Sequence, residues 1–504
     1  MGISLGGFVI KWLKLLHGMV WGPWNLLIFL GTGLFLTVKC RFFQFRGFSF
    51  WLDATAGSII RGKKHNATNE RTPDEGSPET ISQFQSVCTA LAATVGTGNI
   101  AGVATALTAG GPGALFWMWV SAFIGMITAY GETFLGIRFR LREPDGRFLC
   151  GPFLYMEHGL NVPFMAVLYS ILCVMCALGM GSIVQANSAV TALSFTFNLP
   201  LWLPAVCFTL LTGAVIRGGI RSIGRTAERL VPAAAAIYVL FSLTVILSSL
   251  PVLPGVLKDI FDSAFHIRAA AGGAGGFLIS RSVRYGIARG VFSNEAGLGT
   301  LAVLHGPAEH TTPEKQGMWA MFEVFFDTVI LCTLTALVIL CMAEAASPGL
   351  ASLPYEGSAL AAWAFKCRLG NLGEAFISAS MAVFAFATVI AWFYLGKQAL
   401  TYLTIRCSLP ALFSRFLYPL CFLSAILAGG IIQSEAVWLF SDLWNGLMAF
   451  PNLTALLFLS REISLPKTWK KTHSGSRLRY NRKSASPDDD TLFLEKSIIK
   501  REES

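Results

Sequence analysis

An apolar stretch from Phe84 to Gly111 places the strongest constraint on how this chain can fold. It is long enough to cross a bilayer as a helix, which takes roughly 20 residues, yet its centre reads VGTGN from Val95 to Asn99. Glycine costs about 1 kcal/mol per helical position relative to alanine, and asparagine is also a weak helix former. Unwound backbone in lipid is tolerated only where it lines a cavity or binds something. The centre therefore predicts a binding site, the alternative being close helix packing by small residues.

Composition places the rest of the chain in a membrane as well. Of the 504 residues, 54% are hydrophobic and 13% are charged, whereas soluble domains carry roughly 25% charged residues. The net charge of +10 does not indicate a nucleic-acid partner, because the lysines and arginines fall in short segments between apolar runs, as the positive-inside rule requires. The 11 cysteines are scattered, mostly within apolar runs, and we expect them to behave as small hydrophobic residues.

The apolar runs predict an all-α polytopic membrane protein with about eleven transmembrane helices. We expect a basic loop at 217–229, a following span that holds Pro232 in its first turn, and a loop with short helices at 342–371. Alternating the spans puts the three most basic segments and the C-terminal tail on one side of the bilayer. That side is the cytoplasm, and the N-terminus lies outside. The expected spans are residues 19–38, 84–111, 114–137, 164–198, 200–216, 232–250, 272–301, 318–341, 373–396, 409–430 and 434–460.

A second glycine-rich stretch, at 272–301, interrupts the apolar pattern in a position that corresponds to the first. Two broken spans in corresponding halves of a chain indicate a transporter built from an inverted repeat, with its site near the bilayer midplane. We therefore expect a 5+5 inverted repeat with two broken helices and one extra N-terminal helix. The expected segments are an N-terminal extra transmembrane helix (1–40), a cytoplasmic basic loop (41–82), a first core repeat (83–250), an external loop (251–271), a second core repeat (272–460) and a disordered cytoplasmic tail (461–504).

Five segments of the sequence carry a more specific signal. They are GNIAGVATALTAGGPGALFWMW at 98–119, QANS at 185–188, RYGIARGVFSNEAGLGT at 284–300, FDTVILCTLTALVIL at 326–340 and TVIAWFYLGKQALTYL at 388–403. These motifs resemble the alanine/glycine:cation symporter family, and the resemblance covers about residues 20–465. It implies a secondary carrier of small neutral amino acids that is coupled to sodium or to protons.

The VGTGN centre also resembles the VGxGN stretch of neurotransmitter:sodium symporters, in which the asparagine side chain and nearby carbonyls coordinate sodium. Sodium is a hard cation and prefers oxygen ligands. The resemblance thus makes the carbonyls near Thr94 and Val95 candidate ligands, together with the side chains of Asn99 and Thr388. Family members often carry a serine before this threonine. Here Ala387 precedes it, so a second sodium site of that type lacks one hydroxyl.

A small amino acid presents a carboxylate, which needs N–H donors and positive potential. Unwinding across Gly96, Thr97 and Gly98 starts a new half-helix near Asn99. The free amides at the N-terminus of this half-helix would face the carboxylate. We therefore expect these residues of the first break to bind the substrate.

The second break places polar groups in an otherwise apolar setting. Ser293 and Asn294 are candidate substrate ligands there, and Glu295 follows them directly. Ionisable groups at membrane depth are functional by default. Glu295 therefore either binds the substrate ammonium or pairs with nearby Arg289.

Asp327 interrupts a strongly apolar helix. It is a candidate to coordinate the ion or to carry a proton, and the alternative is a structural hydrogen bond to a broken helix. In a regular α-helix, Asp327 lies about 100° from the face that Thr328, Cys332 and Thr335 share.

Gln185 and Asn187 are further candidates on the long helix at 164–198. Two positions correspond to about 200° of rotation, so only one of the two faces the substrate while the other packs against a neighbouring helix. The sequence leaves open which one. Trp392, one turn after Thr388, either forms a wall of a small side-chain pocket or serves packing alone.

From the sequence we expect a transporter of the cell (inner) membrane that lies in the lipid bilayer and imports alanine or glycine with sodium, without a bound cofactor. The alternative is proton-coupled symport of the same substrates, with Asp327 or Glu295 as the proton site. A membrane-embedded enzyme is disfavoured because the chain contains neither an HExxH nor a GxSG motif. A channel needs a continuous polar pore, whereas the polar residues here gather at two helix breaks.

Overall fold

The computed structural model describes residues 5–62, 80–144, 146–265, 274–346, 350–432 and 435–469. The chain divides into two units, Met1–Ser464 and Leu465–Ser504, and every element named below lies in the first. Most of the tail that the sequence predicts to be disordered, from residue 470 onward, lies outside the described residues.

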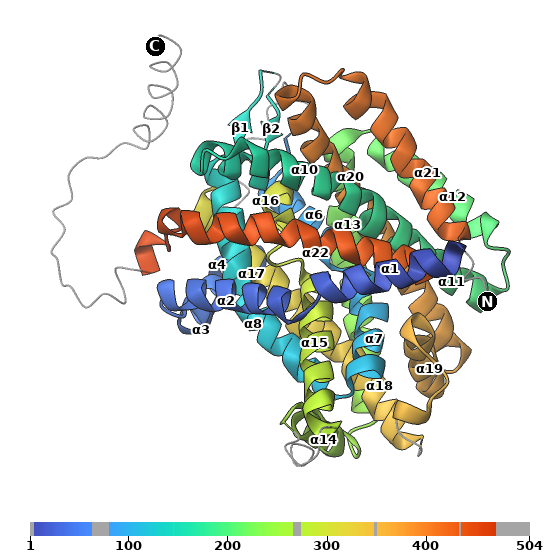
Figure 1. Cartoon of the computed structure of the whole chain (residues 1–504). Coiled ribbons are helices and arrows are strands. Elements are labelled where there is room, and N and C mark those ends of the chain that lie inside the picture. The colour runs from blue at the N-terminus through green and yellow to red at the C-terminus, as the bar shows by residue number, and fades with distance from the viewer. Residues whose placement is uncertain are drawn as a thin grey trace, which may run out of the picture. The chain divides into compact units, whose positions relative to one another are not determined.

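The first unit is built from helices (Figure 1). Up to the middle of the chain they are α1 (Leu5–Val20), α2 (Pro23–Lys39), α3 (Phe43–Arg46), α4 (Phe48–Ala54), α5 (Ala56–Gly62), α6 (Gln83–Thr94), α7 (Ala101–Gly110), α8 (Gly113–Arg138), α9 (Pro152–Leu154), α10 (Pro163–Leu178), α11 (Gln185–Phe197), α12 (Trp202–Ile216) and α13 (Gly219–Leu247). The remaining helices are α14 (Leu253–Phe265), α15 (Ala274–Asn294), α16 (Thr300–Leu304), α17 (Pro313–Val324), α18 (Thr333–Ala345), α19 (Gly357–Leu369), α20 (Asn371–Arg406), α21 (Tyr418–Ile431) and α22 (Glu435–Phe458).

Short segments of other geometry connect or interrupt these helices. The 3-10 segments are η1 (Thr97–Asn99), η6 (Leu350–Ser352) and η8 (Leu459–Glu462). The π-helical segments are η2 (Tyr155–Gly159), η3 (Gly179–Val184), η5 (Phe325–Cys332) and η7 (Phe413–Leu417). Strands β1 (Leu141–Arg142) and β2 (Phe148–Leu149) form a small antiparallel hairpin in which Leu141 pairs with Leu149.

Eight helical segments of the described chain are long and apolar enough to cross a membrane, and counting the bent pair α6–α7 as one span gives nine. This confirms a polytopic helical membrane protein. Length and composition do not establish the predicted count of eleven. Helix α12 has only 15 residues, and α15 carries three arginines within its 21 residues.

The predicted basic loop at 217–229 is wrong, because these residues are helical from Gly219 onward and continue into the apolar span as α13. Pro232 accordingly lies inside the helix and not in its first turn. Membrane helices tolerate an internal proline, since neighbouring groups satisfy the backbone carbonyls that it frees. A basic surface therefore continues directly into a membrane-facing helix.

Two other segments predicted as loops also contain helix. The range 251–271, predicted to lie outside, holds α14, and the basic range 41–82 holds α3, α4 and α5. Residues 63–79 and 266–273 of these ranges lie outside the described part. Helix α14 packs against α8, α15 and α18.

The first break separates α6 from α7, whose axes differ in direction by 52°. Helix α6 begins with a capping box, in which Ser82 and Gln85 each accept from the other's backbone N–H. It ends at Thr94, and the 3-10 turn η1 leads into α7. The predicted unwinding at VGTGN is confirmed.

The second break follows α15. The backbone takes positive φ values at Glu295 (58°), Gly297 (92°) and Gly299 (81°) before α16 begins at Thr300. Left-handed backbone is strained for residues with a Cβ, and glycine adopts it readily. The glycines of the EAGLG motif therefore permit this turn, and the interruption lies at 295–299.

The two breaks lie between two groups of helices. Helix α8 packs against α15 and α17, and α20 packs against α10, α11 and α13. Between them, α7 contacts α15, and α6 contacts α13 and α20. Helix α1 lies along α22 (Figure 1).

Candidate functional site

The first break is closed by the side chain of Asn99. Its Oδ1 accepts a hydrogen bond from the Gly96 backbone N–H at 2.9 Å, so the asparagine replaces a helical partner that the unwound turn lacks. Its Nδ2 donates to Asp327 Oδ1 at 2.5 Å and approaches the Asp327 carbonyl oxygen at 3.3 Å. Asn99 thus links the unwound turn to a carboxylate on another helix.

Asp327 is the centre of a buried polar group that we call the aspartate cluster. Ser293 Oγ donates to Asp327 Oδ1 at 3.2 Å, and Thr328 Oγ1 donates to Oδ2 at 2.8 Å. Asn294 Nδ2 extends the cluster by donating to Thr328 Oγ1 at 3.0 Å. The cluster consists of Asn99, Ser293, Asn294, Asp327, Thr328 and Cys332, all of them buried.

The π-helical geometry of η5 brings Asp327 and Cys332 to the same place. Asn99 Nδ2 lies 3.5 Å from Cys332 Sγ, and Ser293 Oγ lies 3.4 Å from the same sulfur. A regular α-helix would turn residues five positions apart to different directions, whereas a π-helix pairs positions i and i+5. The expected separation of Asp327 from the face of Cys332 therefore does not hold. Thr335 instead pairs with Tyr238 at 2.6 Å.

A second polar group, the threonine–glutamine cluster, surrounds the other side of the VGTGN turn. Gln185 Oε1 accepts from the Thr97 hydroxyl at 3.0 Å and from the Thr97 backbone N–H at 3.3 Å. Thr388 Oγ1 donates to the Ala92 carbonyl at 2.9 Å. Gly96 lies between these groups, because a Cβ placed there would lie 2.6 Å from Thr388 Oγ1 and 3.4 Å from Gln185 Oε1.

The carbonyls at the end of α6 have a distinct environment. The last turn of a helix leaves its carbonyl oxygens without intrahelical partners, and α6 ends at Thr94. The Thr94 hydroxyl remains within the helix, 3.3 Å from the Leu91 carbonyl. Val95 is buried and its N–H donates to the same Leu91 carbonyl at 2.7 Å. At Thr94 and Val95, the backbone oxygens and not the side chains are therefore the groups that match the predicted ion ligands.

The first break contacts the C-terminal end of α15, directly before the second break, at Gly98 and Ser293. A Cβ on Gly98 would lie 3.3 Å from Ser293 Cα and 3.4 Å from Phe292 Cδ1. The absence of a side chain thus permits the close approach of two backbones. Among the predicted substrate residues, Gly96, Thr97, Gly98, Ser293 and Asn294 all lie at this junction.

Gln185 and Asn187 face different neighbours, as their spacing predicts. Gln185 contacts Thr97 at the first break. Asn187 Nδ2 donates to the backbone carbonyls of Gly429 at 3.0 Å and Ile432 at 2.9 Å, at the C-terminal end of α21. The structure therefore brings Gln185 to the break, and the hydrogen bonds of Asn187 join α11 to α21.

Glu295 and Arg289 do not form the ion pair that the sequence left open. Glu295 Oε1 accepts from Trp392 Nε1 at 2.8 Å, while Arg289 lies 3.3 Å from Asp442 Oδ2. Trp392 is fully buried, and a Cβ on Gly181 would lie 2.5 Å from the Trp392 Cβ. The tryptophan therefore combines tight packing against η3 with a polar contact to the second break.

Sequence reasoning missed a buried carboxylate at the second break. Glu132 on α8 accepts from the Gly297 backbone N–H at 2.8 Å and from Asn452 Nδ2 at 2.9 Å. Asn452 also donates to the Gly297 carbonyl at 2.9 Å and accepts from the Tyr155 hydroxyl. The signal was available, because Glu132 is an ionisable residue within an apolar span, and that is the criterion that selected Asp327.

A cavity of about 750 Å³ extends towards the first break. Ala101, at the start of α7, and Phe292, next to Gly98, form part of its wall. Arg289 and Asp442 also line this cavity, and they form an ion pair on its wall. Asn187 lies on this wall and not at the junction itself.

Membrane carriers build sites for small solutes by interrupting helices around buried polar groups within a bundle. The apolar helices and the two joined breaks thus define an integral membrane transporter. Sequence comparison identifies which one: the chain belongs to the sodium:alanine symporter family, whose sequence model matches residues 7–477.

Relatives of known sequence cover nearly the whole chain. An uncharacterised transporter of Haemophilus influenzae is 37% identical over 454 residues, which are 90% of this chain and 94% of the relative. The sodium/alanine symporter AgcS of Methanococcus maripaludis is 37% identical over 449 residues, which are 88% of this chain and 93% of the relative. The probable sodium/glutamine symporter GlnT of Bacillus subtilis is 32% identical over 447 residues, which are 89% of this chain and 87% of the relative.

Solved structures resemble the chain only distantly. A crystal structure of the Eremococcus coleocola manganese transporter covers 85% of this chain and 95% of its own, with 14% sequence identity and a TM-score of 0.39.

Proposed function

We propose that the protein imports alanine or glycine together with sodium, by alternating access around the junction of its two helix breaks. The observation that carries this proposal is the contact of Gly98 with Ser293 beside the Asn99–Asp327 hydrogen bond. This contact puts backbone N–H groups, backbone carbonyls and a carboxylate within one buried region. A zwitterion and a cation require all three kinds of group.

The substrate carboxylate is assigned to the first break. The N-terminus of α7 carries positive potential and N–H groups that have no helical partners. Gly96 and Gly98 add no side chain of their own at this turn, and Thr97 adds a hydroxyl that is already hydrogen-bonded to Gln185. Ser293 and Asn294 face this region from the second break.

We assign Phe292 and Trp392 as walls of a pocket for a small side chain. Phe292 closes one side of Gly98, and Trp392 is held in place by Glu295 and by η3. These rigid aromatic walls favour alanine or glycine.

Sodium is assigned to oxygens on both sides of the VGTGN turn. The carbonyls of Thr94 and Val95 lie at the end of α6, and Thr388 Oγ1 already contacts a carbonyl of the same helix end. Asn99 and the Asp327 carboxylate complete the proposed ligand set. The charge of Asp327 would balance that of the cation, as buried charges in membranes require.

Proton coupling is the competing mechanism for the same substrates. It would use Asp327 or Glu295, both of them fully buried carboxyl groups, as the proton site. Sodium is favoured because the resemblance of VGTGN to a sodium-binding turn coincides with the Asn99 contacts that the structure shows.

The proposal includes the topology. Residues 83–250 and 272–460 would form two inverted repeats around the junction, after an extra N-terminal helix. The N-terminus would lie outside the cell membrane and the C-terminus in the cytoplasm. A tag after Ser504 should then be shielded in intact cells and a tag before Met1 accessible, and the opposite pattern would contradict the repeat as drawn.

Uptake of labelled alanine into proteoliposomes tests the function. We expect accumulation when an inward sodium gradient is imposed and little uptake when choline replaces sodium. Equal uptake in choline would exclude sodium coupling. If uptake then follows an imposed pH gradient and loses its pH dependence in Asp327→Asn, the coupling ion is the proton.

A further inference from the structure

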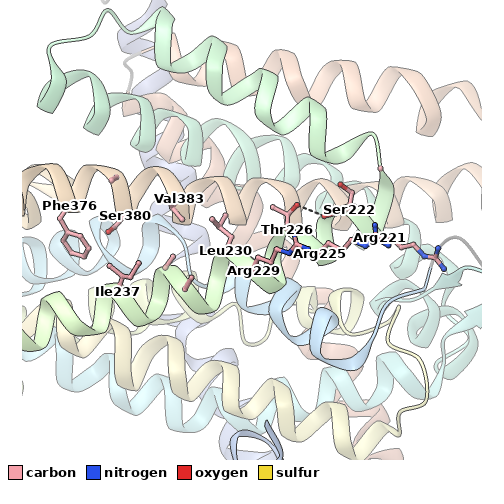
Figure 2. Close-up of a pocket in the computed structure, with 14 residues that line it drawn as sticks. Arg221, Ser222, Arg225, Thr226, Arg229, Leu230, Ile237, Phe376, Ser380 and Val383 are labelled. Atoms are coloured by element: carbon pink, nitrogen blue, oxygen red, sulfur yellow. Dashed lines mark hydrogen bonds between the residues drawn. The ribbon is translucent and has the colours of Figure 1, made fainter. Parts of the chain in front are cut away.

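A groove of about 950 Å³ runs along the outer surface between α13 and α20, remote in sequence from the breaks. Figure 2 shows its two ends. Arg221, Arg225 and Arg229 gather at one end, on successive turns of α13. At the other end, Ile237 of α13 lies beside Phe376 of α20. One groove thus joins a cationic end to an apolar end.

Two of these arginines, Arg225 and Arg229, carry charge that no acidic side chain of the described residues neutralises. Glu228 is the only acidic residue of α13, and it accepts from Gln85 Nε2 at 2.9 Å, on the side of α6. No acidic residue lines the groove among the described residues, and neither Arg225 nor Arg229 has an acidic partner there. Cations near the N-terminus of a helix are also unfavourable by themselves. A bound anion would relieve both effects.

The apolar end matches the depth of one membrane leaflet. From Arg229 to Ile237 the helix rises by about 12 Å, at roughly 1.5 Å per residue. Half of the hydrocarbon core measures about 15 Å. Between these points the wall is formed by small and apolar residues, and the small side chains of Ala233 and Ala379 leave the groove open.

On the topology proposed above, the arginine end of the groove lies at the cytoplasmic leaflet. A small cavity next to it is lined by Glu143 and Arg147 of the hairpin region, Gly219 at the start of α13 and Lys397 of α20, so cations outnumber acidic groups there. These cations mark the side that the positive-inside rule assigns to the cytoplasm. Basic pockets between membrane helices on that side bind the headgroups of anionic lipids.

We propose that this groove binds one anionic phospholipid, with its phosphate between Arg225 and Arg229 and an acyl chain between α13 and α20. Ser222, which lines the same end, adds a hydroxyl donor for the headgroup, whereas the Thr226 hydroxyl donates to the Ser222 carbonyl at 2.8 Å. The bound lipid would stabilise the contact between α13, which holds α6 through Glu228, and α20, which carries Thr388 and Trp392. Lipid binding is measured without transport, so its outcome does not depend on which substrate or coupling ion the protein carries.

Lipid titration of the full-length protein in neutral detergent tests the proposal. Delipidated protein receives dioleoyl phosphatidylglycerol, dioleoyl phosphatidylcholine or inorganic phosphate. Bound lipid is counted by native mass spectrometry, and the midpoint of thermal unfolding is recorded. We expect phosphatidylglycerol to bind at one tight site and to raise the midpoint, and the other two additives to do neither. If phosphatidylcholine has the same effects as phosphatidylglycerol, the proposed contact between the arginines and an anionic headgroup is excluded. If inorganic phosphate has the same effects, the site binds the free anion and the proposed lipid is excluded.

Two kinds of variant locate the site. The double change Arg225→Gln and Arg229→Gln should weaken phosphatidylglycerol binding by about 25-fold, since each basic residue near an anionic surface contributes roughly fivefold. Arg415→Gln, which removes an exposed arginine elsewhere on the same side, should leave binding unchanged. Ala379→Phe should also weaken binding by filling the apolar end, and it keeps the test open if the double variant does not fold.

Unchanged phosphatidylglycerol affinity in both the arginine and the Ala379→Phe variants would overturn the proposal. The acidic run of the chain's own tail, Asp488 to Asp490, is the rival occupant. In that case Asn substitutions in the run, and not added lipid, would change the unfolding midpoint.

Discussion

The two helix breaks, which approach each other at the contact of Gly98 with Ser293, keep their shape by different means. At the first break, Gly96 has an ordinary extended backbone with φ of −131°, and side chains from other helices hold the turn. At the second break, Gly297 and Gly299 adopt φ values of 92° and 81°. The first break therefore rests on polar contacts that a ligand can replace. The second combines left-handed glycines with hydrogen bonds that join Glu132 and Asn452 to Gly297.

The partners of the breaks differ in the same way. Asn99 contacts Asp327 through one amide, and both lie beside further hydroxyls that offer alternative partners. Glu132, by contrast, is fixed by Gly297 and Asn452. We infer that the first break responds to substrate and sodium, while the second is the frame against which it moves. The predictions below separate these two roles.

The largest effect is expected for Gly98→Leu. The bulky side chain would enter the space between Gly98 and Ser293 Cα, where a Cβ alone comes within 3.3 Å. Alanine uptake should fall by at least about 100-fold, as misplacement of about 1 Å at a site can cause, while membrane insertion persists. Gly102→Ala is the matched control, because a Cβ there meets no atom within 4 Å. Near-normal uptake by Gly98→Leu would reduce the first break to a packing feature.

Gly297→Ala should act on stability instead. Its φ of 92° lies in the left-handed region, which costs an L-residue roughly 1–2 kcal/mol, and a Cβ would lie 2.7 Å from Phe29 Cε1. The midpoint of thermal unfolding in detergent should drop clearly, with little change in the sodium dependence of the remaining transport. A variant with normal stability and altered sodium affinity would reverse the roles of the breaks.

Asn99→Ala should raise the sodium concentration for half-maximal uptake by about tenfold. The change removes one proposed oxygen ligand and a hydrogen bond to a carboxylate, and hydrogen bonds to charged groups contribute roughly 1.5–3 kcal/mol. Alanine affinity at saturating sodium should change less. Sodium titration of uptake measures this, with Asn452→Ala at the second break as the comparison. Equal shifts in both variants would show that the breaks are not specialised.

The smallest effect is expected for Asn187→Ala, compared with Gln185→Ala. Asn187 donates to two carbonyls of α21, so its loss should alter alanine affinity by less than about threefold, since a typical hydrogen bond contributes roughly 0.5–1.5 kcal/mol. Gln185→Ala, which leaves Thr97 without its partner, should weaken alanine affinity more. The reverse order in a binding titration would assign the substrate-facing side of α11 to Asn187.

The sequence predicted the first break well because its signal is local. VGTGN within an apolar span is incompatible with a continuous helix, and the structure unwinds there. The same local reasoning separated Gln185 from Asn187, but spacing alone did not decide which of them faces the break. That choice depends on where Thr97 and α21 lie.

The sequence did not predict features that depend on distant partners. Glu132 and Asn452 are 320 positions apart and meet only through the fold. The π-helical turn at η5 leaves no pattern that distinguishes it from a regular helix, so the directions of Asp327 and Cys332 were misjudged. The basic start of α13 looked like a loop because its arginines interrupt the hydropathy, whereas the helix continues through them.

Reciprocal binding of sodium and alanine tests the central claim most directly. If both ligands bind at the first break, sodium should tighten alanine binding, and linkage then requires alanine to tighten sodium binding by the same factor. Isothermal titration of the purified protein should give equal factors, and Asn99→Ala should reduce both together while Gly297→Ala leaves both unchanged. Alanine affinity that does not depend on sodium in the unmodified protein would contradict the account.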